Sequence, residues 1–218
     1  ILLLIVLLSV SCFAERYSFK HITMDMGLSH NQVNGIYRDC DGFMWFSTAN
    51  GLTRYDGYEM RIFMHTSDTT SMADNYVAWV TDLNDSVMIG KNRDNYFFFD
   101  KHTEKFSSAN SYFSSFGVPY NISNIFVDSE ADVWLFCDNS IYIYSSAQKK
   151  MLTPSGGIDI NVGATITSFY ERNRTIYLMC NNGVMLMIPI SDKCEPQKYV
   201  RKQTPVGNGS HNIFIDSD

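Results

Sequence analysis

A short pattern recurs along this 218-residue chain at almost constant spacing. It reads IYRD, VTDL, IFVD, FYER and IFID, and the copies begin at Ile36, Val80, Ile125, Phe169 and Ile213. Successive copies therefore start 44 or 45 residues apart. A fixed period of this length is typical of repeat proteins, in which each unit buries its apolar faces against its neighbours. The spacing thus limits the chain to a row of similar units.

Residues 27–58 show most clearly what one unit contains. They read GLSHNQVNGIYRDCDGFMWFSTANGLTRYDGY. The pairs Asp41-Gly42 and Asn50-Gly51 are hairpin-turn signals, because glycine adopts positive φ without steric cost. The segments around these turns predict three short strands, and residues 58–63 predict a fourth. Four antiparallel strands in each period indicate an all-β fold of β-propeller blades, whereas a β-solenoid, the alternative, usually has shorter repeats.

The period also predicts where each blade lies. We expect four-stranded antiparallel blades at about residues 28–65, 72–106, 119–151 and 161–200, and the start of the next at residues 211–218. Propellers usually have about four to eight blades, because closing the ring removes exposed sheet edges. Residues 15–218 are therefore expected to form a partial β-propeller, an incomplete ring of about four blades plus a fraction.

The first copy closely resembles the two-component regulator propeller repeat. The resemblance rests on the opening residues Gly27, Leu28, Ser29 and Asn31, and on the closing residues 54–57, which read RYDG. It covers about 35 residues tightly, and over residues 72–200 only the period and a few positions remain. The later copies depart from the pattern at Gly51-Leu52, which becomes Asn95-Tyr96, and at Trp45, which becomes Met88 and Tyr177.

The resemblance implies a function for the chain. In that family the repeats form the extracytoplasmic sensor of hybrid two-component regulators, which also carry a membrane helix, a histidine kinase, a receiver and a DNA-binding domain. Residues 15–218 would then be part of a periplasmic sensor domain that responds to a poly- or oligosaccharide. The whole receptor would be an inner-membrane homodimer, and its catalytic parts would lie beyond residue 218. The alternatives are a secreted polysaccharide-degrading propeller enzyme and a surface adhesion scaffold.

The first residues resemble an export signal. Residues 1–10 are apolar except for Ser9, and Ala14 precedes the charged Glu15. This run is too short to span a bilayer, but it suits a signal peptide over residues 1–14 with a truncated start. The segment could instead be a buried N-terminal strand, or Cys12 could be lipidated, although Ser9 stands where a lipidation signal prefers leucine.

The charge of the chain limits the classes of molecule that it can bind, and its cysteine positions limit its disulfide bonds. The formal net charge is −6 and no Lys/Arg cluster is present, which argues against nucleic acid or an anionic membrane as a partner of this segment. After Ala14 four cysteines remain, of which Cys137 and Cys180 follow equivalent strands of consecutive blades. Equivalent points on packed sheets are about 10 Å apart, beyond disulfide reach, so we expect buried free thiols.

Acidic turns are the best candidates for a metal site. They recur at residues 39–41, 128–132 and 216–218, and alternating carboxylates can chelate Ca²⁺. No bidentate glutamate follows at the EF-hand spacing, however, and aspartate is favoured in hairpin turns in any case. The histidines are scattered without ligand spacing. We therefore predict no metal and no cofactor.

The tryptophans are the best candidates for contacts with a sugar ring. Trp45 and Trp134 occupy the same second-strand position, which faces a neighbouring sheet, so we assign both to the core. Trp79 lies on a first strand, near the axis of the ring, and is the candidate ligand-binding residue. No catalytic residue is predicted, because the chain has no GxSxG, P-loop, GxGxxG or HExxH motif.

Overall fold

The computed structural model describes residues 19, 21–160 and 165–204, and within them almost all regular structure is β. Blade 1 contains β1 (Val33–Arg38), β2 (Met44–Thr48), β3 (Gly51–Tyr55) and β4 (Met60–Phe63). Blade 2 contains β5 (Trp79–Asp82), β6 (Val87–Lys91), β7 (Tyr96–Asp100) and β8 (Lys105–Ser108). Blade 3 contains β9 (Asn124–Val127), β10 (Asp132–Cys137), β11 (Ser140–Ser145), β12 (Lys150–Met151) and β13 (Ile158–Asp159). Blade 4 contains β14 (Ile166–Arg172), β15 (Thr175–Cys180), β16 (Val184–Pro189) and β17 (Val200–Gln203).

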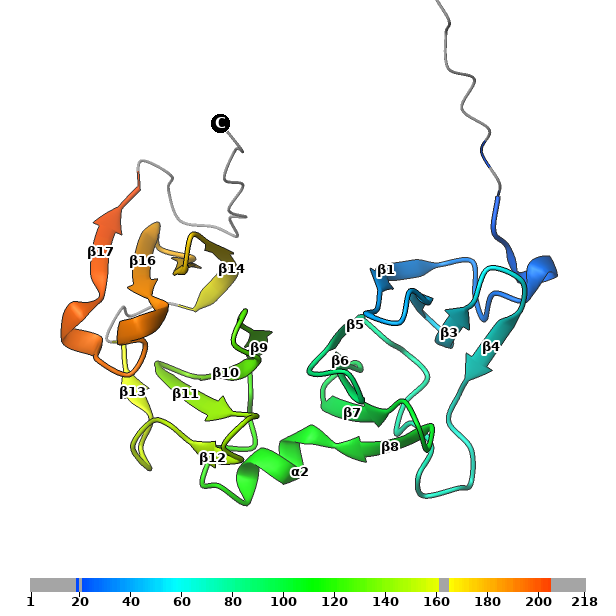
Figure 1. The fold of residues 1–218 in the computed structure, drawn as a ribbon, viewed down its shortest axis with the longest axis horizontal. Helices are drawn as coiled ribbons and strands as arrows, with labels where there is room; N and C mark the ends of the chain where they lie inside the picture. The colour runs from blue at the N-terminus through cyan, green and yellow to red at the C-terminus, as the bar shows by residue number, and fades with distance from the viewer. Residues whose placement is uncertain (1–18, 20, 161–164, 205–218) are drawn as a thin grey trace, which may run out of the picture.

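Each blade is an antiparallel sheet whose strands pair in chain order, and β13 adds to blade 3 by pairing with β11. Within the described residues, four short helices lie outside the sheets: η2 (Met24–Met26), α2 (Ala109–Ser114), η3 (Ile190–Asp192) and η4 (Pro196–Lys198). The blades follow one another along an arc, and the first strands β1, β5, β9 and β14 lie on its inner side (Figure 1). The predicted fold of β-propeller blades is confirmed. Residues 1–14 and 211–218, predicted as a signal peptide and the start of the next blade, lie outside the described residues.

The repeated pattern pairs with the second strand in every described blade, across a turn that is one residue shorter in blade 4. Its first residue pairs across to the second strand as Ile36 with Phe46, Val80 with Gly90, Ile125 with Leu135 and Phe169 with Leu178. In blades 2 and 3 this residue is buried against the preceding blade. In blade 1 no preceding blade covers it among the described residues, and Ile36 is 63% exposed.

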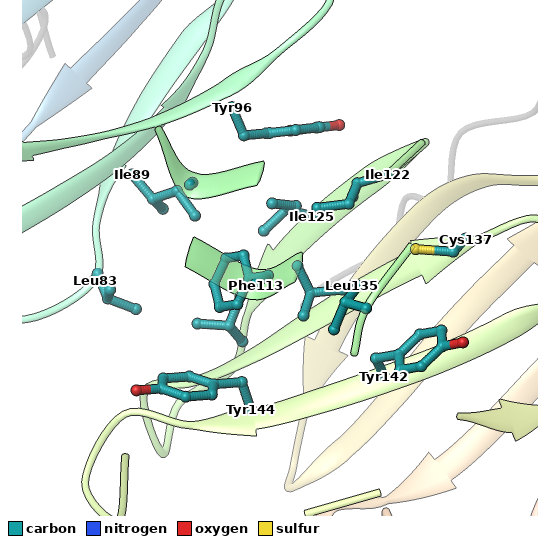
Figure 2. Close-up of a cluster of buried hydrophobic side chains, with 13 residues drawn as sticks. Leu83, Ile89, Tyr96, Phe113, Ile122, Ile125, Leu135, Cys137, Tyr142 and Tyr144 are labelled. Atoms are coloured by element: carbon teal, nitrogen blue, oxygen red, sulfur yellow. The ribbon is translucent and has the colours of Figure 1, made fainter. Parts of the chain in front are cut away.

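The hydrophobic core lies between the blades, as the repeat architecture requires. Alternation along β7 shows this directly, because Phe97 and Phe99 pack toward blade 1 whereas Phe98 packs toward blade 3. Trp45 and Trp134, predicted as core residues, are 1% and 0% exposed. Figure 2 shows the cluster between blades 2 and 3, in which Phe113 of α2 lies between Leu83 of blade 2 and Leu135 of blade 3.

Two expectations need correction. The sequence predicts no element between the blades at residues 72–106 and 119–151, but Ala109–Ser114 in this interval form helix α2, capped where Ser108 Oγ accepts a hydrogen bond from Ser111 N at 3.1 Å. Six residues are too few for a helical period to be visible in the sequence. The four described cysteines are free, and Cys137 and Cys180 are buried as expected, but Cys40 and Cys194 are exposed.

Candidate functional site

In blades 1 and 3 the turn between the first two strands faces the next blade and is built on one aspartate. In blade 1, Asp39 accepts hydrogen bonds from Phe43 N at 2.8 Å and from the indole Nε1 of Trp45 at 2.7 Å. In blade 3, Asp128 accepts bonds from Asp132 N and from Trp134 Nε1, both at 2.9 Å. The aspartate thus ties the turn to the tryptophan that fills the core.

Between blades 3 and 4 a buried lysine completes this turn. Lys193 Nζ lies 3.0 Å from Asp128 Oδ2, 2.9 Å from Glu130 Oε2 and 2.5 Å from Asp132 Oδ2, and its side chain is 8% exposed. Burial alone would lower the pKa of Lys193, but hydrogen bonds to the three carboxylates outweigh it, so the pKa is raised and the ammonium stays charged. Arg174, which like Lys193 belongs to blade 4, forms an ion pair with Glu130 of blade 3. We call this contact interface 3–4.

Between blades 1 and 2, at interface 1–2, Lys101 has the corresponding role. Its Nζ lies 3.2 Å from Asp41 Oδ2, 3.1 Å from Asp82 Oδ1 and 3.3 Å from Cys40 Sγ. Both lysines belong to the connection between the third and fourth strands of the later blade. The acidic turns at residues 39–41 and 128–132, considered as calcium loops in the sequence, therefore contact lysine ammonium groups. The third, at residues 216–218, lies outside the described residues. Within the described part of the chain, no group of three His, Cys, Asp or Glu side chains is placed to hold a metal ion.

Interface 2–3, between blades 2 and 3, is built differently. The strand pairing places Ile89, and not Met88 as the sequence suggested, where Trp45 and Trp134 stand. Leu83 stands where the turn aspartates Asp39 and Asp128 stand. Helix α2 contributes Tyr112, whose hydroxyl lies 2.5 Å from the hydroxyl of Tyr144. A pocket of about 320 Å³, which we call the interface pocket, opens beside these residues. It is lined by Leu83, Asn84, Val87, Phe98, Asp100, Ser107, Tyr112, Tyr144, Ser146 and Lys149.

A second pocket lies on the inner side of the arc, where three first strands meet. This axial pocket has a volume of about 330 Å³ and is lined by Trp79, Thr81, Ile125, Phe126, Val127 and Phe169. The rings of Phe126 and Phe169 are 4.3 Å apart between centroids, and Trp79 packs at 6.1 Å against Tyr96. Trp79, the candidate from the sequence, thus lies in a pocket with two aromatic residues that sequence reasoning missed. The repeat contains a signal for both, because Phe126 is the second residue of the IFVD copy and Phe169 is the first residue of the FYER copy.

The axial pocket is suited to binding. Its three aromatic side chains are half-buried, so each shows part of its ring to the pocket. Aromatic rings offer large apolar contact faces, and the Thr81 hydroxyl adds a group that donates or accepts a hydrogen bond. Such a mixture of apolar walls with a few polar groups is typical of small-molecule sites.

Comparison with known proteins gives structural neighbours only. No protein-family model matches the chain, and no curated protein matches its sequence. Among solved structures, the extracellular domain of BT3049 from B. thetaiotaomicron, assigned to the hybrid two-component systems, is similar with a TM-score of 0.62 and 19% identity, over 85% of this chain and 26% of that one. The extracellular domain of BT4673 from the same organism gives 0.54 and 12%, over 87% and 32%.

A third neighbour has a different biological context. PorZ, a surface component of the type-IX secretion system of Porphyromonas gingivalis, gives a TM-score of 0.53 and 7% identity, over 80% of this chain and 23% of that one. This chain therefore spans only about a quarter to a third of the length of these neighbours. Among the described residues no helix has the length and apolarity needed to cross a bilayer. The chain has the β-propeller fold that is found in the extracellular domains of hybrid two-component systems.

Proposed function

We propose that this chain is the N-terminal part of the periplasmic ligand-sensing propeller of a hybrid two-component sensor histidine kinase, and that its ligand is a poly- or oligosaccharide. Two independent observations support the sensor role: the repeat pattern of residues 27–58 and the fold shared with extracellular domains of such systems. The same proposal has the protein exported by residues 1–14, anchored in the inner membrane by a later segment, and active as a homodimer.

The axial pocket is the observation that carries the choice of ligand. Trp79, Phe126 and Phe169 come from three different blades, so a ligand held between them contacts three repeats at once. The C–H faces of a sugar ring pack against aromatic side chains, while its hydroxyls need polar partners such as Thr81. A volume of about 330 Å³ suits one unit of an oligosaccharide. Ligand contacts spread over several blades give binding a means to bias their arrangement, which a sensor requires.

Calorimetric titration of the full-length protein with a set of oligosaccharides tests this proposal. We expect one saccharide to bind, and Trp79→Leu to weaken its binding about tenfold or more, because the main stacking surface is lost. Tyr58→Leu is the control, since Tyr58 is an aromatic residue that is 94% exposed on blade 1. Equal losses in the two variants, or binding that neither variant changes, would remove the axial pocket from the proposal. Release of reducing ends from the saccharide would instead favour the enzyme alternative.

A further inference from the structure

The interface pocket has two kinds of wall. Most of its exposed lining is apolar, from Leu83 and Val87 of blade 2 and from the aromatic rings of Phe98, Tyr112 and Tyr144. The three rings form part of an edge-to-face group, with Phe98 at 5.5 Å from Tyr112 and Tyr112 at 5.7 Å from Tyr144. These contacts hold the apolar wall in place, so the pocket offers a fixed surface to an apolar group.

The polar part of the lining has unused hydrogen-bonding capacity. Ser146 Oγ is buried and has no hydrogen-bond partner. Asn84 uses its Oδ1 atom to accept from Ser86 N and Val87 N, which leaves its amide Nδ2 group able to donate. A buried hydroxyl without a partner costs free energy, and native proteins keep few of them. The pocket is thus prepared for a ligand that supplies the missing partner.

Charges of both signs border the same pocket. Asp100 accepts hydrogen bonds from Thr103 N at 2.8 Å and His102 N at 3.0 Å, and the bond from Thr103 is the main reason why the pKa of Asp100 is lowered. Its carboxylate is therefore ionised at neutral pH. Lys149 lies on the opposite blade and forms no ion pair with any described residue. A ligand in this pocket meets an anion from blade 2 and a cation from blade 3.

Lys149 occupies a position in the repeat, the connection between the third and fourth strands, where the other interfaces have an ion-paired lysine. At interfaces 1–2 and 3–4 this connection supplies Lys101 and Lys193, and carboxylates of the neighbouring turn neutralise them. At interface 2–3 it supplies Lys149, but the neighbouring turn has the apolar Leu83 at the position of Asp39 and Asp128. Asp85, at the position of Asp41 and Glu130, forms no ion pair with Lys149 in the described part of the chain. A pocket of about 330 Å³ also lies at interface 1–2, where Lys101 and Asp41, which line it, pair with each other. Only at interface 2–3, among the described interfaces, does the lysine remain available to a ligand.

We propose that the interface pocket binds a free α-amino acid with an apolar side chain, held as its zwitterion. The side chain would pack against the wall of Phe98, Tyr112 and Tyr144. Lys149, Ser146 and Asn84 would bind the α-carboxylate, and Asp100 would bind the α-ammonium. A volume of about 320 Å³ is at the small end of ligand pockets, which suits one amino acid rather than a peptide. This ligand differs in class from the saccharide of the axial pocket, so the two proposals stand or fall separately.

The first test changes the ligand and leaves the protein intact. L-phenylalanine, L-leucine and L-methionine are titrated into the full-length protein with ligand-observed NMR as the readout, and glucose and galactose serve as neutral comparisons. We expect at least one amino acid to bind, and its N-acetyl and carboxamide derivatives to bind about tenfold more weakly, because each lacks one of the two charges. Equal binding of the derivatives, or no binding of any amino acid, overturns the proposal.

The second test changes the protein at a site where folding is not at risk. Lys149→Met should weaken amino acid binding about tenfold, whereas Lys150→Met should leave it unchanged. Lys150 is the exposed neighbour of Lys149 and the first residue of β12, so the net charge change is identical. Asp100→Asn keeps an oxygen for the Thr103 amide but removes the charge, and should also weaken binding. Loss of binding in Lys150→Met as well, or in Trp79→Leu alone, would place the amino acid outside the interface pocket and contradict the inference.

Discussion

Interfaces 3–4 and 2–3 each join two consecutive blades of the same repeat, yet they are held together by different interactions. At interface 3–4 Lys193 is surrounded by three carboxylates, two of which belong to nearly or fully buried side chains. At interface 2–3 the contact is made by helix α2 and by tyrosine and phenylalanine rings, and the equivalent lysine is exposed. One interface is closed by charge pairing, and the other leaves a pocket.

This difference teaches how a repeat fold makes room for a ligand. The repeat needs every interface for stability, because each blade buries its faces only against its neighbours. In blade 2, Ile89 replaces the tryptophan and Leu83 replaces the turn aspartate, so the aspartate–tryptophan turn of blades 1 and 3 is absent from it. Helix α2, which no other described blade has, replaces it with an apolar contact. We infer that the interface pocket formed at interface 2–3 because this interface lacks the ion-paired contact of the other two.

The largest expected effect is at interface 3–4. Lys193→Met should lower the free energy of unfolding by about 3–5 kcal/mol, because it leaves buried carboxylates without their cation. Lys198→Met is the matched control, since Lys198 pairs with Asp192 and Glu195 at a side-chain exposure of 47%, and it should cost about 0–1 kcal/mol. Denaturant unfolding of both variants measures the difference. Equal losses would show that the buried ion pairs do not hold this interface.

A smaller loss is expected at interface 1–2. Lys101→Met should lower the free energy of unfolding by about 1–3 kcal/mol, because Asp82 loses its cation while the exposed Asp41 is solvated by water. The same denaturant experiment ranks it against Lys193→Met. A larger loss at Lys101 than at Lys193 would mean that burial of the carboxylates does not set the size of the effect.

A still smaller effect is expected from the tyrosine pair at interface 2–3. Tyr112→Phe removes the hydroxyl that bonds to Tyr144 and should cost about 0.5–1.5 kcal/mol, the net value of one hydrogen bond. Tyr58→Phe, on an exposed ring, should cost nothing measurable. Thermal unfolding of the two variants tests the pair, and a stabilised Tyr112→Phe would show that the short hydroxyl contact is unfavourable.

The pH dependence of stability gives the smallest signal. Lys193, and after it Arg174, lower the pKa of Glu130 below its usual value of 4.5. Because the folded pKa is the lower one, the contribution of Glu130 is complete above pH 4.5 and is lost as the pH falls through the folded value. Stability should therefore fall below pH 4.5 in the wild type and less steeply in Glu130→Gln. Identical slopes from pH 6 to pH 3 in urea unfolding would contradict this ion pair.

The parts of the fold that repeat could be predicted from the sequence. The 44-residue period placed β1, β5, β9 and β14, and the position of Trp45 and Trp134 in the repeat predicted their burial. Trp79 was found for the same reason, since a first strand lies near the axis. Its part in ligand binding stays a prediction.

The parts that do not repeat could not be predicted. Lys101 and Lys193 reach their carboxylates from loops of different length and structure, so no spacing in the sequence marks them. The interface pocket combines Asn84, helix α2 and Lys149 from three segments, and only packing brings them together. One available signal was the departure of the second copy from the repeat at Leu83, where the first and third copies have Asp39 and Asp128.

Two lysines on the connections between third and fourth strands, Lys149 and Lys193, allow the most direct test of this account. Lys149→Met and Lys193→Met remove the same group from the same place in the repeat, at the unpaired and at the ion-paired interface. We predict that denaturant unfolding shows no more than about 0.5 kcal/mol of destabilisation for Lys149→Met and about 3–5 kcal/mol for Lys193→Met. Equal destabilisation by the two substitutions would contradict the claim that interface 2–3 has given up ion-paired closure for ligand binding.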